Sequence, residues 1–339
     1  MTIKSQEEKL FVIVTSISAP NEVLKALADG CQEYHHQFIV IGDVKSPEEF
    51  QLPGCDFYNI RDQHKLEFKF VQICPENHYA RKNIGYLLAI KSGATVIVDT
   101  DDDNIPYASF WEKRHKTQEV SVVEKAGWLN VYRYFSNSNI WPRGYPLNQI
   151  IRDVPVEASL PVRLLSCPIQ QGLANKNPDV DAIYRLTSSL PQDFLNRSSI
   201  ALAHQSWCPF NSQNTTWWKE AFFLLYLPSF CSFRMTDIWR SFVAQRISWQ
   251  YDWPILFHES TVWQERNEHD LMRDFEDEIP GYLYNEKIGD ELEGLTLRRG
   301  HENISDNLKI CYEKLVEMNL VDAKELQLLD AWIADLKSL

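Results

Sequence analysis

The sequence has no uninterrupted apolar run long enough to cross a membrane, since a spanning helix needs about 20 such residues. Its densest apolar stretch, WWKEAFFLLYLPSFCSF, is broken by Lys219, Glu220 and Pro228. The first residues also lack the basic segment of a signal peptide, because acidic residues flank their single short apolar run. We therefore expect a cytoplasmic protein without a transmembrane segment, with a peripheral position at the inner membrane as the alternative.

The sequence also lacks paired cysteines and an excess of basic residues. Its seven cysteines are scattered and include no C-x-x-C pair, which is typical of reduced, buried thiols. The formal net charge of -13 argues against binding to nucleic acid or to an anionic membrane. Anionic substrates stay possible, because a local basic site or a bound cation can reverse the sign of the field.

The first half of the chain alternates strand and helix signals, a pattern typical of a mostly parallel α/β sheet flanked by helices. From about residue 285 onward the pattern becomes helical. We therefore expect an α/β domain over residues 1–285 and a C-terminal helical extension over residues 286–339. The expected strands cover residues 10–17, 37–43, 55–60 and 95–100, and the expected helices cover 21–34, 80–93, 237–251, 303–321 and 322–339.

Four carboxylates crowd into five residues where an apolar strand ends, in GATVIVDTDDDNIP. Alternate residues of an extended segment face the same way, so Asp101 and Asp103 should converge while Asp102 points elsewhere. Mg²⁺ and Mn²⁺ prefer oxygen ligands and complete their shells with phosphate oxygens. Ligands of such sheets bind beyond the strand ends. The stretch therefore predicts a cation site for a nucleotide diphosphate; the alternative is an acidic turn formed with Asn104 and Pro106.

Two cations stand at the start of the helix that leads into this strand. Positive charge is unfavourable at a helix N-terminus, and a bound diphosphate would compensate for it. Arg81 and Lys82 are therefore candidate contacts to that diphosphate, and a solvated basic pair is the alternative. Asp102 and Asp99 are expected to support the cation site, with Asp102 among the nucleotide-binding residues.

Several separate strings of the sequence resemble one known family. They are ARKNIGYLLAIKSGATVIVDTDDDN, IWPRGYPL, GLANKNPDVDAIYRLT, FRMTDIWRSFVAQR and ERNEHDLMRDFEDE. Together they resemble the STELLO family of glycosyltransferase-like proteins and, more distantly, the reversibly glycosylated polypeptides, which are UDP-arabinopyranose mutases. The resemblance covers roughly residues 8–285. It implies a GT-A fold with a nucleotide-sugar site, and it maps the D-x-D metal motif onto Asp101 to Asp103.

The resemblance implies a glycosyltransferase that depends on Mn²⁺ or Mg²⁺ and moves a sugar from a nucleotide-sugar donor to a glycan or another hydroxyl acceptor. Cell-surface polysaccharide assembly is the role that fits best. Plant members carry an N-terminal membrane anchor that is not seen in this sequence, so a Golgi role is not expected. Two alternatives stay open: a sugar-nucleotide mutase acting on a UDP-pentose, and a non-catalytic GT-A scaffold that binds a partner transferase.

The GT-A pattern also suggests roles for single residues. Asp43, near the end of the second strand, is a candidate for holding uracil or ribose, and Thr15 for lining the base pocket. An ordinary turn or strand-end residue is the alternative for both. Asp237 precedes a helix, so it is either the general base of an inverting reaction or a helix N-cap. His269 is a candidate third metal ligand, with a solvated charged helix as the alternative.

Three further residues and three tryptophans have candidate roles at an acceptor site. Asp181 would orient a sugar hydroxyl, Asp179 would serve as a cap or turn residue, and Arg185 would reach phosphate or pair with an aspartate. Tryptophans that could stack on a sugar face are Trp207, Trp217 and Trp218, although most of the eleven tryptophans must be core or lid.

Overall fold

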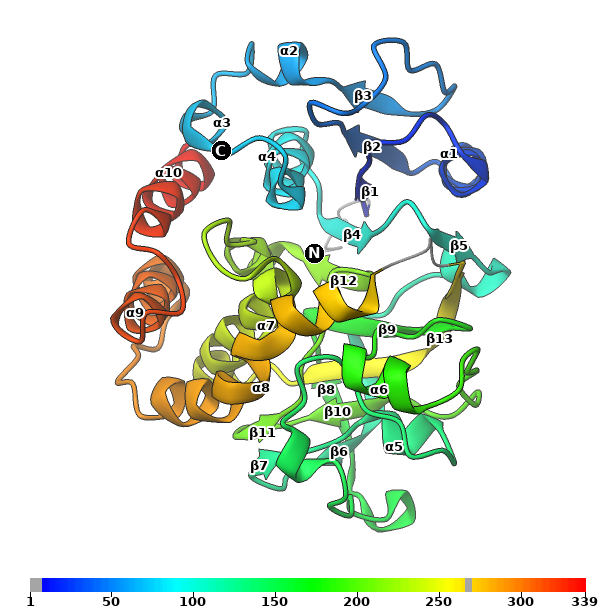
Figure 1. The fold of residues 1–339 in the computed structure, drawn as a ribbon, viewed down its shortest axis with the longest axis vertical. Coiled ribbons are helices and arrows are strands. Elements are labelled where there is room, and N and C mark those ends of the chain that lie inside the picture. The colour runs from blue at the N-terminus through cyan, green and yellow to red at the C-terminus, as the bar shows by residue number, and fades with distance from the viewer. Residues whose placement is uncertain (1–7, 266–269) are drawn as a thin grey trace, which may run out of the picture.

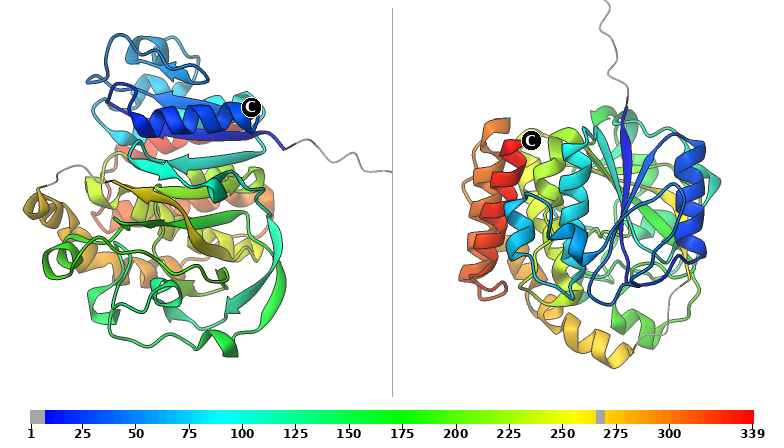
Figure 2. Two further views of the ribbon diagram at one scale, coloured as in Figure 1. Left: turned by 90° about the vertical axis from the view of Figure 1, so that its right-hand side faces the viewer. Right: turned by 90° about the horizontal axis from the view of Figure 1, so that it is seen from above.

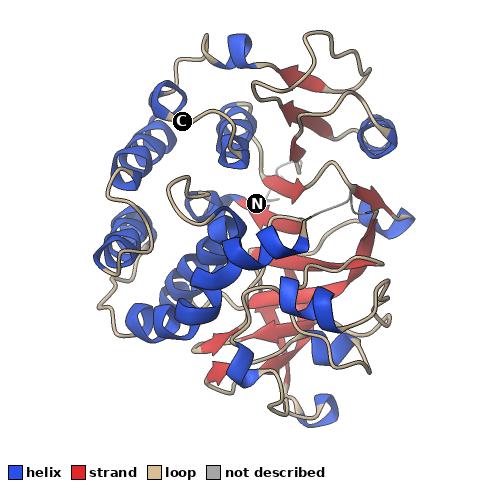
Figure 3. Cartoon of the chain, in the orientation of Figure 1, coloured by secondary structure: helices blue, strands red, loops and turns tan. Residues whose placement is uncertain are grey.

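The computed structural model describes residues 8–265 and 270–339 and is built on one large sheet with helices on both faces (Figures 1 and 3). The strand order is β3-β2-β1-β4-β12-β9-β13-β10-β6-β8, and β5 pairs with β13. The strands of this sheet are β1 (Leu10–Thr15), β2 (Gln37–Ile41), β3 (Asp56–Tyr58), β4 (Val96–Thr100), β5 (Asn104–Pro106), β6 (Thr117–Val123), β8 (Val162–Ser166), β9 (Ile169–Asn175), β10 (Ile200–Leu202), β12 (Asn214–Trp218) and β13 (Ile255–Gln264).

The helices divide between the two faces of the sheet, and Figure 2 shows α1 on one side and α4 with the C-terminal helices on the other. A small second sheet pairs β7 (Gly127–Trp128) with β11 (Ser206–Trp207). The helices are α1 (Glu22–Glu33), α2 (Ile60–Gln63), α3 (Lys69–Ile73), α4 (Lys82–Lys91), α5 (Tyr132–Phe135), α6 (Ala182–Thr187), α7 (Thr236–Ser248), α8 (Leu271–Glu293), α9 (Ile304–Glu317) and α10 (Glu325–Ser338).

The first four strands form the parallel unit that the sequence predicts. β1 pairs in parallel with both β2 and β4, and β2 pairs in parallel with β3. The run Leu10–Val14 is apolar throughout because both faces of β1 are covered. Phe11 and Ile13 pack with α4, while Leu10, Val12 and Val14 pack with α1. This arrangement aligns the carboxyl ends of β1, β2 and β4 at one edge of the sheet.

The second half of the chain adds strands of both directions. β12 is antiparallel to its neighbours β4 and β9, whereas β9 and β13 are parallel to each other. These strands lie outside the four that the sequence predicts, and they extend the same sheet. The predicted fold class, an α/β sheet of GT-A type with C-terminal helices, is confirmed.

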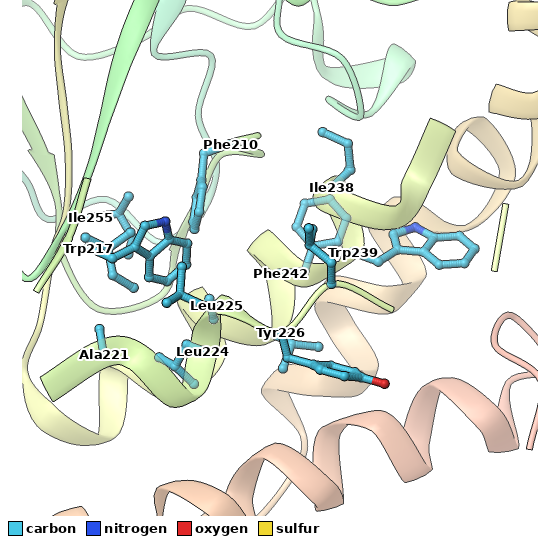
Figure 4. Close-up of a cluster of buried hydrophobic side chains, with 14 of the residues drawn as sticks. Phe210, Trp217, Ala221, Leu224, Leu225, Tyr226, Ile238, Trp239, Phe242 and Ile255 are labelled. Carbon is cyan, nitrogen blue, oxygen red and sulfur yellow. The ribbon is translucent and has the colours of Figure 1, made fainter. Parts of the chain in front are cut away.

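The core on the α4 side is built around aromatic residues (Figure 4). Every residue of α7 is buried, and Trp217 of β12 packs nearby with Phe210. The three tryptophans considered for sugar stacking are all buried, and none of them lines either of the two cavities described below. The stacking prediction is therefore wrong for Trp207, Trp217 and Trp218, which serve the core.

The C-terminal helices are fastened to the sheet domain by two buried carboxylates. Asp335 of α10 accepts hydrogen bonds from the backbone nitrogens of Lys69 and Phe70, at 2.9 and 2.8 Å, and so caps α3. Glu325 holds the segment just after η5 (Lys219–Leu225), a 3₁₀ helix. The predicted boundary at residue 285 falls inside α8, which runs continuously from Leu271 to Glu293. The helices added beyond it are α9 and α10.

In the part of the chain that the structure describes, no helix combines the length and the apolar character needed to cross a bilayer.

Candidate active site

Two adjoining cavities open at the edge where β1, β2 and β4 end. The first has a volume of about 270 Å³ and the second about 310 Å³. Both are lined by Thr15, Tyr79, Asp102 and Phe233. The first cavity is mainly charged, and its other lining residues are Asp101, Asp103, Arg143, Asp179, Arg185, Ser212, Gln213, Arg234, Asp237 and Gln264.

The aspartate triplet lines the first cavity as a group. β4 ends at Thr100, and residues 101–103 form a turn before β5, so the alternation of an extended strand does not continue through them. Asp102 consequently faces the cavity with Asp101 and Asp103. The prediction that Asp102 points elsewhere is therefore wrong.

Each carboxylate of the triplet is held by a different donor. Asp101 accepts a hydrogen bond from Lys82 Nζ at 2.9 Å, and Asp102 accepts one from Ser16 Oγ at 2.5 Å. Asp103 Oδ2 accepts one from Gln264 Nε2 at 2.8 Å. Burial raises the pKa of Asp101 to about 6, although Lys82 opposes the shift.

Lys82 does not reach either cavity, so the prediction that it contacts a diphosphate is wrong. Its ammonium is fully buried and lies 2.6 Å from Asp99 and 2.9 Å from Asp101. Burial alone would lower the pKa of Lys82, but the two aspartates raise it, so the side chain stays charged. Asp99 is also fully buried and pairs with Arg240 at 2.9 Å. Lys82 thus neutralises the aspartates from inside the protein.

Arg81 borders the second cavity but is almost completely buried. Its guanidinium donates to Gln63 Oε1, at 2.8 and 2.5 Å, and to the carbonyl oxygens of Cys74 and Pro75. These acceptors are all neutral. Arg81 therefore contributes positive charge to the wall of the second cavity while its donors fix the surrounding loops.

The second cavity contains the two residues predicted to face a base or ribose, Thr15 and Asp43. Asp43 accepts hydrogen bonds from the backbone nitrogens of Asn77 and His78, both at 2.9 Å. The Asp43 carboxylate therefore fixes the loop that precedes Tyr79. The rings of Tyr79 and Phe233 meet edge to face at 5.2 Å between centroids and form an aromatic wall.

Arg143 joins two aspartates in the lining of the first cavity. Its guanidinium lies 2.7 Å from Asp179 and 2.9 Å from Asp237. Asn211 Nδ2 also donates to Asp179, at 2.8 Å. The sequence does not predict this network, because Arg143 lies in the loop string IWPRGYPL, far in sequence from both partners.

Asp237 lines the first cavity, but it is not the N-cap of α7, so the cap prediction is wrong. The cap position is Met235, and Asp237 lies in the first turn, where a negative charge suits the helix dipole. Burial raises the pKa of Asp237, but Arg143 outweighs burial and leaves that pKa below its ordinary value. A carboxylate with a lowered pKa is a weak general base.

Asp181 is buried away from both cavities. It caps α6 by accepting a hydrogen bond from the Tyr184 nitrogen at 2.8 Å, and it accepts another from Trp141 Nε1 at 2.6 Å. The predicted sugar contact at Asp181 is therefore wrong, and the cap role expected of Asp179 belongs to Asp181. Arg185 lines the first cavity and donates to the carbonyl oxygen of Pro178 at 2.8 Å.

The donor set suits a divalent cation that is completed by its substrate. In residues 8–265 and 270–339, no three His, Cys, Asp or Glu side chains are grouped closely enough to hold a metal ion by themselves. Mg²⁺ sites typically use one or two carboxylates and take further oxygens from phosphate and water. Asp101, which is 36% exposed, and Asp103 meet that requirement at the cavity wall. The predicted third ligand, His269, lies outside the described residues.

The sheet and the cleft at its strand ends thus define a protein with a GT-A-type fold. Residues 234–339 match the family model described as STELLO glycosyltransferases. Two proteins of Arabidopsis thaliana are each 28% identical to this chain. Probable glycosyltransferase STELLO2 aligns over 277 residues, which are 74% of this chain and 35% of the relative. Probable glycosyltransferase STELLO1 aligns over 264 residues, which are 72% and 34%.

The predicted resemblance to the STELLO family is confirmed by these matches. The chain spans about a third of the length of the curated relatives it matches. The family model covers α7 to α10, so the C-terminal helices are part of the shared region and not an addition peculiar to this chain.

Proposed function

We propose that this protein is a glycosyltransferase that moves a sugar from a nucleotide-sugar donor to a hydroxyl group of a glycan. The observation that carries the proposal is the aspartate triplet, whose three carboxylates line one cavity at the strand ends of a GT-A-type sheet. The similarity to probable glycosyltransferases supports it. Assembly of a polysaccharide is the setting that suits such an acceptor.

The second cavity suits the nucleoside of the donor. The rings of Tyr79 and Phe233, which meet edge to face, line this cavity together with polar groups of Asp43 and Asn77. A base can pack against the rings while its edge meets hydrogen-bonding groups, which is the usual composition of small-molecule sites. Thr15 and Asp102 line both cavities, so they lie where the nucleoside would join the diphosphate.

The first cavity suits the diphosphate and the transferred sugar. Asp101 and Asp103 would hold Mn²⁺ or Mg²⁺, with Asp102 beside them. When bound, the metal supplies positive charge that offsets the charge developing on the diphosphate leaving group. Arg185 and Arg234 line the same cavity and add positive charge to it. Lys82 does not contact the donor, but its buried ammonium offsets the negative charge of Asp101 and so reduces repulsion within the triplet.

Asp237 is better suited to positioning than to proton transfer. Its carboxylate is tied to Arg143 and accepts a hydrogen bond from the Ser212 nitrogen at 3.2 Å. A general base should have a pKa near the working pH, whereas that of Asp237 is lowered. We therefore propose that Asp237 and Arg143 together shape the sugar end of the cavity.

The test is a thermal-shift screen of nucleotide sugars with and without Mn²⁺, because a ligand that binds the folded state raises its apparent stability. We expect one donor to stabilise the protein only when the metal is present. Asp103→Asn should abolish that metal-dependent shift while the unfolding temperature without ligand stays near that of the wild type. Asp29→Asn, on the exposed surface of α1, is the matched control.

Two outcomes would change this conclusion. Metal-dependent donor binding that survives in Asp103→Asn would remove the triplet from the site. Ring contraction of a UDP-pentose in the absence of any acceptor would support a mutase in place of a transferase.

A further inference from the structure

A third cavity, with a volume of about 420 Å³, shares no lining residue with the first two. It lies on the other face of the sheet's second half. Leu256 and His258 of β13 line it, whereas Ile255 and Phe257 point to the core on the α7 side. The volume falls within the range of about 300–1,000 Å³ that is usual for small-molecule sites.

Part of the cavity lining is a basic loop whose backbone is fixed by hydrogen bonds from two glutamine side chains. Lys113, Arg114 and His115 are consecutive and all line the cavity. The carbonyl oxygen of His115 accepts hydrogen bonds from Gln118 and from Gln170, both at 3.0 Å. The basic side chains are therefore presented from a fixed backbone in a protein whose net charge is strongly negative.

Arg114 is the residue that points most directly to a ligand. Its Nε donates to Thr216 Oγ1 at 3.0 Å, and its guanidinium lies 4.9 Å from the centre of the Phe110 ring. Among residues 8–265 and 270–339, no carboxylate lies within 4.0 Å of it, and its terminal nitrogens have no acceptor. Burial lowers the pKa of Arg114 to about 10, and nearby Glu8 only partly opposes that shift.

The charges of the lining permit an anion to bind, and the lining also contains uncharged polar groups. Two carboxylates, Glu112 and Glu259, are present, against the three cations Lys113, Arg114 and Arg197. Arg197 already donates to the carbonyl oxygen of Tyr134 at 3.1 Å. The lining also offers hydroxyl and amide groups from Asn196, Ser198 and Ser199.

We propose that this cavity is a second ligand site, which binds the oxyanion group of a phosphorylated, sugar-sized molecule through Arg114 and Lys113. The planar guanidinium of arginine matches the oxygens of a phosphate group in a fork of two hydrogen bonds. The hydroxyl and amide groups of Asn196, Ser198 and Ser199 suit the sugar part. Since the aspartate triplet plays no role here, binding at this site needs no divalent metal.

The experiment is calorimetric titration of the full chain with inorganic phosphate, with glucose 6-phosphate and with uncharged glucose. All titrations are done in EDTA and in an Asp103→Asn background, so that the first cavity does not contribute. We expect both phosphates to bind and glucose not to. Lys113→Glu should weaken phosphate binding about tenfold or more, and Lys25→Glu, an exposed change on α1, should leave it unaltered.

Lys113 is exposed, so Lys113→Glu tests the site without disturbing the packing of Arg114 on Phe110. Arg114→Gln is the stronger variant and is interpreted only if its unfolding curve matches that of the wild type. The proposal fails if phosphate binding is absent up to about 10 mM, if Lys113→Glu binds like the wild type, or if binding appears only with added Mn²⁺.

Discussion

Lys82 shows how a single buried cation makes a crowded acidic site compatible with folding. It contacts Asp99 and Asp101 and also donates to the carbonyl oxygens of Thr100 and Ser212, at 2.6 and 3.3 Å. These contacts hold together the end of β4 and the start of β12. Removing one partner of such a buried arrangement leaves uncompensated charge in a region of low polarity.

We therefore expect Lys82→Met to lower the free energy of unfolding by about 3–5 kcal/mol, as measured by urea denaturation at pH 7. Asp101 loses its cation, while Asp99 keeps Arg240. Lys25→Met on the exposed side of α1 is the control and should change the free energy of unfolding little. A loss below about 1 kcal/mol for Lys82→Met would mean that its ion pairs contribute no more than surface pairs do.

The ion pair of Arg143 and Asp237 makes a pH-dependent contribution to the free energy of unfolding. The pKa of Asp237 is lowered in the folded state from an ordinary value of 3.8. A lowered carboxylate pKa stabilises the fold above the unfolded-state pKa, and that stabilisation is lost as the pH falls through the folded-state pKa.

Asp237→Asn should therefore reduce the free energy of unfolding by about 1–3 kcal/mol at neutral pH, since Arg143 still keeps Asp179 as a partner. The difference in the free energy of unfolding between wild type and variant should become smaller below a pH of about 4. Denaturation curves collected from pH 7 to pH 3 give this comparison. If this difference in the free energy of unfolding stays constant over that range, the charge of Asp237 is not what stabilises the fold.

At the scale of elements, α10 controls the segment that leads into both cavities. Glu325 is fully buried and accepts hydrogen bonds from the backbone nitrogens of Ser229 and Phe230, at 2.9 and 2.6 Å, and from the Tyr226 hydroxyl. The same segment continues to Phe233 and Arg234, which line the first cavity. Glu325 is therefore a positioning residue for the site, although it does not touch it.

Glu325→Ala leaves three buried donors without an acceptor, so we expect the free energy of unfolding to fall by about 3 kcal/mol or more. Donor binding should weaken as well, because the segment before Phe233 loses its support. Glu325→Gln keeps an acceptor oxygen and should recover most of both losses. Glu317→Ala, whose side chain is 70% exposed on α9, is the control. Equal losses for the alanine and glutamine variants would contradict a role based on hydrogen bonds.

At the scale of the whole molecule, local signals predict the first half of the site and miss the second. The apolar run of β1, the Asn21 cap of α1 and the aspartates after β4 can all be recognised within about 20 residues of sequence. Their common placement follows from the rule that parallel strands end at one edge.

The other half depends on contacts between segments far apart in the chain. Arg143 meets Asp237 across 94 residues, and Glu325 meets Ser229 across 96. No periodicity or capping signal encodes such pairs. The extended-strand rule also fails for Asp102, because the chain turns immediately after Thr100.

The position of β12 has a consequence for how the protein is made. β4 ends at Thr100 and pairs with β1 on one side, but its neighbour on the other side is β12, residues 214–218, and Gln264 of β13 holds Asp103. During synthesis the parallel unit of β1 to β4 emerges from the ribosome with an unpaired, apolar edge at β4. More than a hundred further residues must be synthesised before that edge is covered. Such late pairing slows folding and favours aggregation. We therefore expect the nascent chain to depend on protection from aggregation until β12 and β13 have been synthesised.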